Sequence, residues 1–405
     1  MKHIKFDKGV FVKTLPCGNQ CYQDIYADVS REDAYCYITE LGRINHAQIQ
    51  ATTLNDNIFA CIIGEDEIIN LTYLKHDSSL TILHDPLIET DYLYNDIFHT
   101  KITETTLAVI PLDYSHREIT DAHGMCFIIT LEDGRYIVID GGYGNYERNG
   151  ASRSSLDSQI IYQYLHRHKK RAGKITIAAW IFTHPHPDHY SAFIKFNELY
   201  SDVDIQSFVY NNGDFSTYST IHPLNSFLSD ELPCIIKRSY PNAKIIKPHT
   251  AQGLKFCNVT LTAIYTQELA IPYFKPIINN TSLVFRMRVK NTTVLFMADC
   301  DIEATELITR IYQDSIKSDI MQVNHHGYSG ATINLYDCVN PDYTIWPTSK
   351  KAFKLRVSGE KYQFIGNAIE SNKYIFDKLG KEKCIVADDK ITYIVFNDDG
   401  YFITQ

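Results

Sequence analysis

TIAAWIFTHPHPDH, residues 176–189, joins an apolar run to a dense group of metal-ligating side chains. The run TIAAWIF predicts a buried strand, and THPHPDH carries three imidazoles and one carboxylate within six residues. Alternation along an extended chain sends His184 and His186 to the same side, and a turn after them lets Asp188 and His189 face a second point nearby. Imidazole and carboxylate ligands suit zinc, iron or manganese. The stretch therefore predicts a metal site at a strand-to-helix junction.

Two later segments add ligands of the same kinds. Asp299 directly follows the apolar strand TTVLFMA, where a buried carboxylate is costly unless it binds a cation or accepts hydrogen bonds. His325 and His326 follow the apolar run DIMQVN and precede Gly327, which permits a tight turn around a metal. Taken alone, Asp299 could equally cap the next helix. Beside the first motif, metal ligation is the stronger interpretation for both segments.

In order and spacing, four segments resemble the metallo-β-lactamase-fold hydrolases: IVIDGG (137–142), THPHPDH (183–189), MADCD (297–301) and VNHHG (323–327). The resemblance covers about residues 105–405, where strands alternate with helices. It implies an α/β chain folded as an αββα sandwich. It also implies a metal-dependent hydrolase, although a fold that hosts many reactions does not define the substrate.

The resemblance also implies a role for each residue of these segments. The implied ligands are His184 and His186 for a first divalent ion, Asp188 and His189 for a second, and Asp299 as a bridge between them. One member of the histidine pair would complete the second site. His326 is the preferred ligand, with His325 reaching the substrate or donating a proton. Asp140, before two glycines, would orient the metal-binding loop from behind.

One segment departs from the superfamily pattern. Many members supply a further first-ion histidine before the bridging aspartate, but this chain has INNTSL at 278–283. That pattern, together with HHG, resembles a phosphodiesterase-like branch that includes the soluble domain of the bacterial competence DNA-uptake channel protein and the phosphorylcholine esterases. Asn279 and Asn280 would either line the substrate pocket or cap the strand that they precede. His249 and His222 would either supply a further ligand or be surface histidines.

These residues predict a hydrolase in which two divalent ions activate a hydroxide nucleophile. Zinc is the expected metal, with manganese and iron as alternatives. Asp188 would hold the hydroxide, and His325 would stabilise developing charge or protonate the leaving group. The resemblance to the phosphodiesterase-like branch implies a phosphodiester or a phosphorylated small molecule as the substrate, and the alternative is a thioester, carboxylic ester, lactone or β-lactam. A non-enzymatic, metal-stabilised binding protein is a further alternative, against which the intact ligand set argues.

The composition is that of an ordinary globular chain. Of 405 residues, 44% are hydrophobic and 21% are charged, which excludes a disordered chain. The formal net charge of −9 disfavours a nucleic-acid partner without excluding one. The N-terminus lacks a signal-peptide pattern, no apolar run approaches the ~20 residues of a membrane helix, and the scattered cysteines suit a reducing compartment. We therefore expect a cytoplasmic protein with a small-molecule substrate and no membrane partner. A homo-oligomer is compatible with the sequence.

Residues 1–100 predict a separate small α+β module. SREDAYCYITEL begins with Ser30, a helix N-cap, and three strand-like runs follow it at 57–64, 67–74 and 79–85. No cluster of ligands or nucleophiles is visible along this stretch. We interpret it as an accessory or dimerisation module, with substrate gating as the alternative, and assign the hydrolase domain to residues 105–405.

Overall fold

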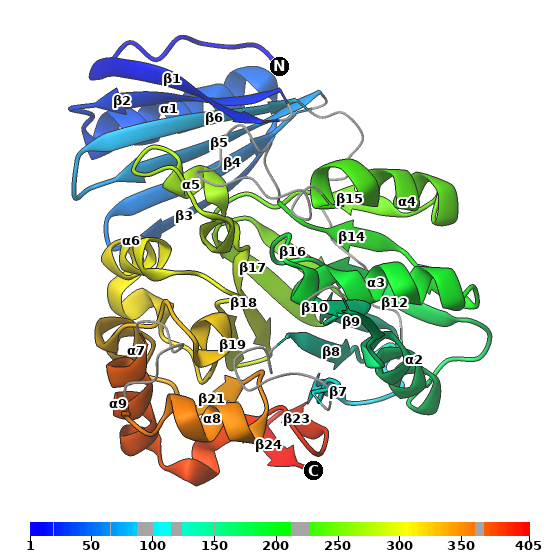
Figure 1. Ribbon diagram of the computed structural model, residues 1–405. Coiled ribbons are helices and arrows are strands. Elements are labelled where there is room, and N and C mark those ends of the chain that lie inside the picture. Colours follow the sequence, from blue (N-terminus) through cyan, green and yellow to red (C-terminus); the bar gives the residue numbers. More distant parts are fainter. Residues whose placement is uncertain are drawn as a thin grey trace.

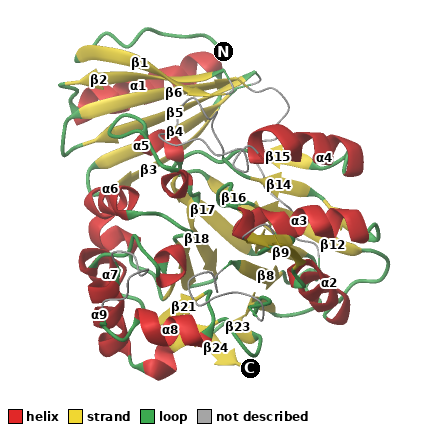
Figure 2. Ribbon diagram, in the orientation of Figure 1, coloured by secondary structure: helices red, strands yellow, loops and turns green. Residues whose placement is uncertain are grey.

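Two β-sheets packed face to face form the centre of the computed structural model, and helices cover their outer faces (Figure 1, Figure 2). Apolar side chains from both sheets fill the space between them, among them Phe127 and Phe296, whose ring centroids lie 5.2 Å apart. This is the αββα sandwich predicted from the sequence. The structure describes all residues except 19, 65, 87–99, 115–123, 149–150, 212–226 and 361–367, and the side chains of 48, 145–148 and 151–154 are also not described.

The first sheet holds the strand that leads into the histidine motif. Its order is β15-β14-β12-β9-β8-β7-β23-β24, with β13 also paired to β12. Because β12 runs parallel to β9 and β14, their carboxyl ends meet at one edge of the sheet. The strands are β7 Thr105–Val109, β8 Cys126–Thr130, β9 Tyr136–Asp140, β12 Ile175–Ile181, β13 Val203–Ile205, β14 Ser207–Val209, β15 Lys244–Ile246, β23 Thr392–Asn397 and β24 Gly400–Thr404. Strands β10 Asn145–Arg148 and β11 Ala151–Ser154 form a hairpin that is separate from this sheet. The outer helices are α2 Asp157–Arg167, α3 Pro187–Leu199 and α4 Leu232–Ser239.

The second sheet follows chain order from β16 to β22 and carries the other ligand segments. Its strands β19, β20 and β21 are parallel, so their carboxyl ends also share an edge. The strands are β16 Gly253–Phe256, β17 Val259–Tyr265, β18 Val284–Val289, β19 Thr292–Phe296, β20 Ile320–Gln322, β21 Tyr343–Trp346 and β22 Cys384–Val386. The helices are α5 Gln267–Ala270, α6 Ile302–Tyr312, α7 Ile333–Val339, α8 Lys350–Arg356 and α9 Ile369–Leu379. Within the described ranges, no helix combines the length and apolar content needed to cross a membrane.

The N-terminal part of the chain forms its own antiparallel sheet, with strand order β1-β2-β6-β5-β4-β3. Helix α1 (Arg31–Asn45) lies where it was predicted, and Ser30 caps it by accepting a hydrogen bond from Asp33 N at 3.0 Å. The apolar side of α1 packs on one face of this sheet. The predicted strands correspond to β4 Asn57–Ile63, β5 Glu67–Leu74 and β6 Ser79–Pro86, and the structure adds β1 Val10–Gly18, β2 Cys21–Ala27 and β3 Gln48–Leu54.

The opposite face of the N-terminal sheet contacts the sandwich. Phe59 of β4 is fully buried, and its ring stacks on that of Tyr312 of α6 at 5.6 Å. Asn57 Nδ2 donates a hydrogen bond at 3.0 Å to Ile311 O, in the last turn of the same helix. Apolar stacking and satisfied polar groups therefore fix the sheet against the end of α6.

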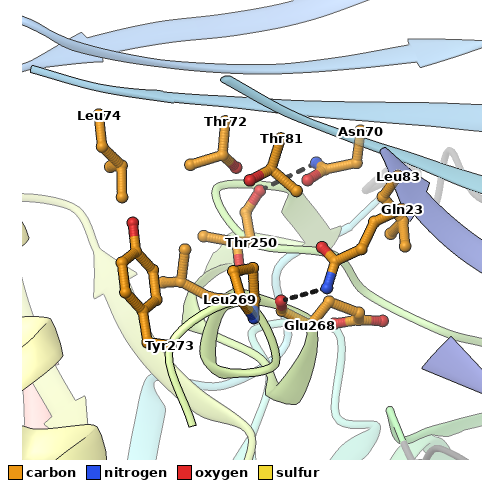
Figure 3. Close-up of a pocket in the computed structure, with 11 residues that line it drawn as sticks. Gln23, Asn70, Thr72, Leu74, Thr81, Leu83, Thr250, Glu268, Leu269 and Tyr273 are labelled. Carbon is orange, nitrogen blue, oxygen red and sulfur yellow. Dashed lines mark hydrogen bonds between the residues drawn. The ribbon is translucent and has the colours of Figure 1, made fainter. Parts of the chain in front are cut away.

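A cavity lies between the same face and a part of the sandwich that includes Thr250 and helix α5 (Figure 3). Hydrogen bonds cross it at two points. Asn70 Nδ2 donates to Thr250 O at 3.2 Å, and Gln23 Nε2 donates to Glu268 O at 3.2 Å. The contact between the N-terminal sheet and the sandwich is thus partly polar, with side chains of β2 and β5 meeting main-chain carbonyl groups.

Phe59→Ala is expected to lower the free energy of unfolding by about 3–5 kcal/mol, because it removes a fully buried ring and leaves a cavity against α6. Urea unfolding of the full chain, followed by far-ultraviolet circular dichroism, measures the change. Phe11→Ala is the matched control, since Phe11 is 54% exposed and its loss should cost only about 1 kcal/mol, through its edge-to-face contact with Tyr26. Equal losses for the two variants would contradict the assignment of Phe59 to this contact.

Candidate metal centre

The histidine motif lies where β12 ends and α3 begins. The strand is almost entirely buried, so the position of its carboxyl end is fixed by packing. His186 remains extended, with φ −94° and ψ 143°, and Pro187 takes the first helical position, where its missing N–H costs nothing. The chain therefore turns after His186, and Asp188 and His189 fall in the first turn of α3.

Two overlapping groups of ligands come together at this point. The first consists of His184, His186 and Asp299, whose ligand atoms all lie within 4.8 Å of one another. His184 Nε2 is 3.0 Å from His186 Nδ1 and 3.7 Å from Asp299 Oδ2. His184 is buried and His186 is partly exposed, so this group opens toward solvent.

The second group consists of Asp188, His189, His326 and again Asp299, all of them buried. His326 Nε2 lies 3.3 Å from both Asp188 Oδ2 and Asp299 Oδ2. His189 Nε2 lies 3.2 Å from Asp299 Oδ2 and 3.5 Å from Asp188 Oδ2. Two imidazole nitrogens that face the same two carboxylate oxygens are a donor set suited to a divalent cation.

Asp299 is the residue that both groups share. It follows β19 after Ala298, whose positive φ of 48° turns the chain there. Its Oδ1 is buried and has no hydrogen-bond partner among the described residues. Burial opposes its ionisation, but His326 and His189 outweigh burial and hold the pKa of Asp299 well below its usual range. A buried, ionised carboxylate with an unused oxygen fits a position between two cations.

The loop that carries HHG has a strained backbone. His325, His326 and Gly327 all adopt positive φ values, of 45°, 56° and 85°. Arg356 Nη1 donates a hydrogen bond to His326 O at 2.7 Å, and Asn372 Nδ2 donates one to Gly327 O at 2.6 Å. These contacts hold the loop in place. Sequence reasoning missed Arg356 and Asn372, because both reach the loop only through the packing of α8 and α9.

The two histidines of this loop have different surroundings. His326 Nδ1 lies 3.1 Å from Pro347 O, which leaves Nε2 for the carboxylates of the second group. His325 Nδ1 lies 2.8 Å from Ser329 Oγ, and its Nε2 is 3.6 Å from Asp299 Oδ2. Burial lowers the pKa of His325 to about 4. Its side chain is 18% exposed, against 0% for His326, so His325 lies beside the group and nearer to solvent.

Asp140 lies behind the ligand groups, at the end of β9. Its Oδ1 accepts a hydrogen bond from Thr183 N at 2.8 Å, and its Oδ2 accepts one from Thr183 Oγ1 at 2.7 Å. Oδ2 is also 2.7 Å from His189 Nδ1, which leaves His189 Nε2 for Asp299. Burial raises the pKa of Asp140 above its ordinary value, and the contacts with His189 and Thr183 offset only part of that rise. The carboxylate thus holds both the backbone of the motif and one imidazole ring.

Asp140→Asn is expected to weaken metal binding by about 10–100-fold, the usual cost of losing a group that orients a ligand. The amide can still accept from Thr183 N, but its NH₂ end cannot accept a hydrogen bond from His189 Nδ1–H. Competition with a chromophoric chelator measures the affinity. Thr183→Ser keeps the hydroxyl and should bind metal like the parent protein; unchanged affinity in Asp140→Asn would contradict the orienting role.

Asn279 faces the site, whereas Asn280 does not. Asn279 Nδ2 is 3.4 Å from His325 Nδ1, and its Oδ1 is buried with no hydrogen-bond partner in the described part of the chain. Asn280 Nδ2 donates to Glu303 Oε2 at 3.0 Å, and its Oδ1 accepts from Asp301 N at 2.9 Å. Both ends of the Asn280 amide are therefore used at the start of α6, and a role in lining the pocket stays a prediction.

His249 lies in a different buried cluster. Its Nε2 is 2.9 Å from Asp85 Oδ2 of the N-terminal sheet, and its Nδ1 is 3.4 Å from Glu268 Oε1. Burial lowers the pKa of His249, but the two carboxylates prevail and raise it above its ordinary value. His249 is thus neither a surface histidine nor a member of either ligand group; it connects the N-terminal sheet to the sandwich. His222 lies outside the described residues.

Residues 119–205 match the family model described as Metallo-beta-lactamase superfamily. This segment contains Asp140 and the whole motif 183–189, whereas Asp299 and the HHG loop lie beyond it. A search of curated proteins found no match. This segment is similar to the metallo-β-lactamase superfamily, and the chain carries a His/Asp cluster that could hold metal.

Three solved structures illustrate a remote similarity to this chain. The metallo-beta-lactamase fold protein YhfI from Bacillus subtilis is 11% identical with a TM-score of 0.39, and the match covers 75% of this chain and 100% of that one. CmlA, a diiron beta-hydroxylase from Streptomyces venezuelae, is 10% identical with a TM-score of 0.40, covering 71% and 53%. A metallo-beta-lactamase from Cronobacter sakazakii is 12% identical with a TM-score of 0.31, covering 63% and 90%.

Proposed function

We propose that this chain is a metal-dependent hydrolase that binds two divalent ions and acts on a phosphodiester or a phosphorylated small molecule. The position of Asp299 carries the proposal. Its Oδ2 lies between 3.2 and 3.7 Å from a nitrogen of His184, of His189 and of His326. One carboxylate therefore serves both ligand groups, as a bridge between two ions requires.

Residues of both sheets would hold the ions. The first ion would be held by His184, His186 and Asp299, and the second by Asp188, His189, His326 and Asp299. When bound, the ions would supply Lewis acidity and lower the pKa of a water molecule toward neutrality. The mixed imidazole and carboxylate donors suit zinc, with iron and manganese as alternatives.

The charge of this donor set favours an anionic substrate. Its negative members are Asp188 and Asp299, because imidazoles bind metal in their neutral form. Two carboxylates offset only half of the charge of two divalent ions, so the loaded site would keep a net positive charge. A phosphodiester anion gains more from that charge than a neutral ester or lactam does. The INNTSL and HHG segments, which resemble the phosphodiesterase-like branch, point to the same substrate class.

Asp188 and His325 would act on the reacting atoms. Asp188 Oδ2 faces the same point as His189 and His326, so it would accept a hydrogen bond from the attacking water and orient it. His325 is positioned by Ser329 and reaches toward Asp299 with its Nε2. It would donate a hydrogen bond to the oxygen that gains negative charge as its bond to phosphorus breaks.

Hydrolysis of bis(4-nitrophenyl) phosphate by the zinc- or manganese-loaded protein tests this function. We expect turnover that disappears in His186→Ala, because that substitution removes a ligand of the first group and leaves the buried second group in place. His166→Ala, which changes an exposed histidine of α2, is the control and should retain turnover. Turnover that survives in His186→Ala would contradict the proposal.

Hydrolysis of a thioester, carboxylic ester, lactone or β-lactam at the same site is the alternative, because the same ions would polarise a carbonyl group. A protein that binds two ions but leaves the phosphodiester intact would favour these substrates. A protein that binds metal and hydrolyses none of them would favour a metal-stabilised binding protein.

A further inference from the structure

A third group of metal-ligating side chains lies on the N-terminal sheet. His3, Glu67 and His84 bring their ligand atoms within 4.8 Å of one another. The neighbours of His84 on β6 point to the opposite face, where Asp85 contacts Lys247 and His249 of the sandwich. His84 therefore lies on the outer face of the sheet, which also carries α1. This group is separate from the proposed catalytic centre.

Strand register explains why these residues meet. His84 of β6 pairs directly with Ile69 of β5, and Glu67 lies two residues before Ile69. Glu67 and His84 are thus diagonal neighbours on one face of adjacent strands, within reach of long side chains. Tyr22 pairs with His84 on the other side, and their rings stack at 4.7 Å. The segment before β1 then brings His3 to within 2.8 Å of Glu67 Oε1.

His84 is the residue of this cluster whose surroundings indicate a bound ligand. It is 8% exposed, and its Nδ1 is buried with no hydrogen-bond partner among the described residues. The nearest carboxylate oxygen, Glu67 Oε2, is 4.0 Å away, which is too long for a hydrogen bond. Burial lowers the pKa of His84 to about 4, so the ring stays neutral near pH 7. A neutral, buried imidazole nitrogen without a partner is costly unless something binds it.

The carboxylate of Glu67 has other charged neighbours as well. The amino group of Met1 lies 3.6 Å from Glu67 Oε1 and 2.7 Å from Asp66 Oδ1. The amino group thus lies beside Oε1, whereas Oε2 is the oxygen that faces His84 Nδ1, at 4.0 Å. The side chain of His3 is 49% exposed, so the cluster is open to water on that side.

We propose that His3, Glu67 and His84 bind a zinc ion, with water as the remaining ligand. Two histidines and one glutamate form a known three-residue zinc donor set that leaves a position open. Tetrahedral ligands about 2.0–2.2 Å from one zinc ion lie roughly 3.3–3.6 Å apart. Glu67 and His84 are 4.0 Å apart, so their side chains would draw together by about half an ångström on binding. The ion would fasten the residues before β1 to β5 and β6, where Phe6 already packs into the core under α1.

Zinc content per chain, measured on tag-free protein equilibrated at one buffered free-zinc concentration, tests the proposal. We expect His3→Gln and His84→Gln each to contain one zinc ion fewer than the parent protein and to keep full hydrolase turnover. His46→Asn is the matched control, because His46 is exposed on the same sheet module and asparagine tolerates its positive φ of 48°. It should retain the full zinc content.

Thermal unfolding gives a second readout. Zinc should raise the melting temperature of the parent protein more than that of His3→Gln, since binding to the folded state stabilises it. His3 is half exposed, so His3→Gln should fold even if His84→Gln does not. Equal zinc content and equal zinc stabilisation in the parent protein and His3→Gln would overturn the proposal. That result would leave the proposed hydrolase untouched, because the catalytic ligands are unchanged.

Discussion

Asp299→Asn should abolish hydrolysis, with kcat/KM falling by at least about 1,000-fold, because several kcal/mol of charge stabilisation depend on the ions that Asp299 would bridge. The substitution removes the negative charge that both ligand groups share and leaves His184, His189 and His326 facing an uncharged amide. Metal content should fall together with turnover. Elemental analysis of the purified variant and a chromogenic phosphodiester assay measure the two effects.

Asp301→Asn makes the same chemical change two residues later and is the matched control. Asp301 caps α6 by accepting a hydrogen bond from Ile302 N at 2.8 Å, and asparagine caps helices about as well as aspartate. This variant should keep its metal and its turnover. If Asp299→Asn kept two ions per chain, the bridging role of Asp299 would be wrong.

His325→Ala and His326→Ala should fail in different ways. His326→Ala is expected to lose metal and turnover together, since Nε2 of His326 faces Asp188 and Asp299 at 3.3 Å. His325→Ala should keep its metal and lose about 10²–10³-fold in kcat, the usual cost of removing one donor that stabilises developing charge. The loss should be larger for diesters with poor leaving groups, which develop more negative charge on the departing oxygen.

A series of aryl phosphodiesters with leaving groups of different pKa measures this difference. The dependence of log kcat on leaving-group pKa should be steeper for His325→Ala than for the parent protein. Ser329→Ala, which removes only the partner of His325 Nδ1, should show a smaller change in the same direction. If the His325→Ala variant lost a metal ion, His325 would be a metal ligand. If the slope were unchanged, His325 would not stabilise the leaving group.

The sandwich and the clustering of the side chains in the histidine motif could be predicted because their geometry is local. His184, His186, Asp188 and His189 lie within one strand–turn–helix segment, so backbone alternation and the proline-started helix place them without help from the rest of the chain. Alternating apolar strands and amphipathic helices likewise specified the layers, because each element must bury its apolar face against another.

Other features depend on contacts between distant segments, and local patterns do not encode them. The surroundings of His325 and His326 depend on Pro347 and Ser329, and those of Asn280 on Glu303 at the start of α6. β1 was not predicted because it is largely exposed and carries little apolar alternation.

His249 and His84, which lie outside the candidate metal centre, show most clearly the difference between local patterns and contacts between distant segments. His249 meets Asp85 from a sheet 164 residues away along the chain, and His84 meets Glu67 through the register of β5 and β6. A histidine's residue type indicates what it can bind. Its neighbours are set by strand register and by packing between layers, since these bring together groups that the chain keeps far apart.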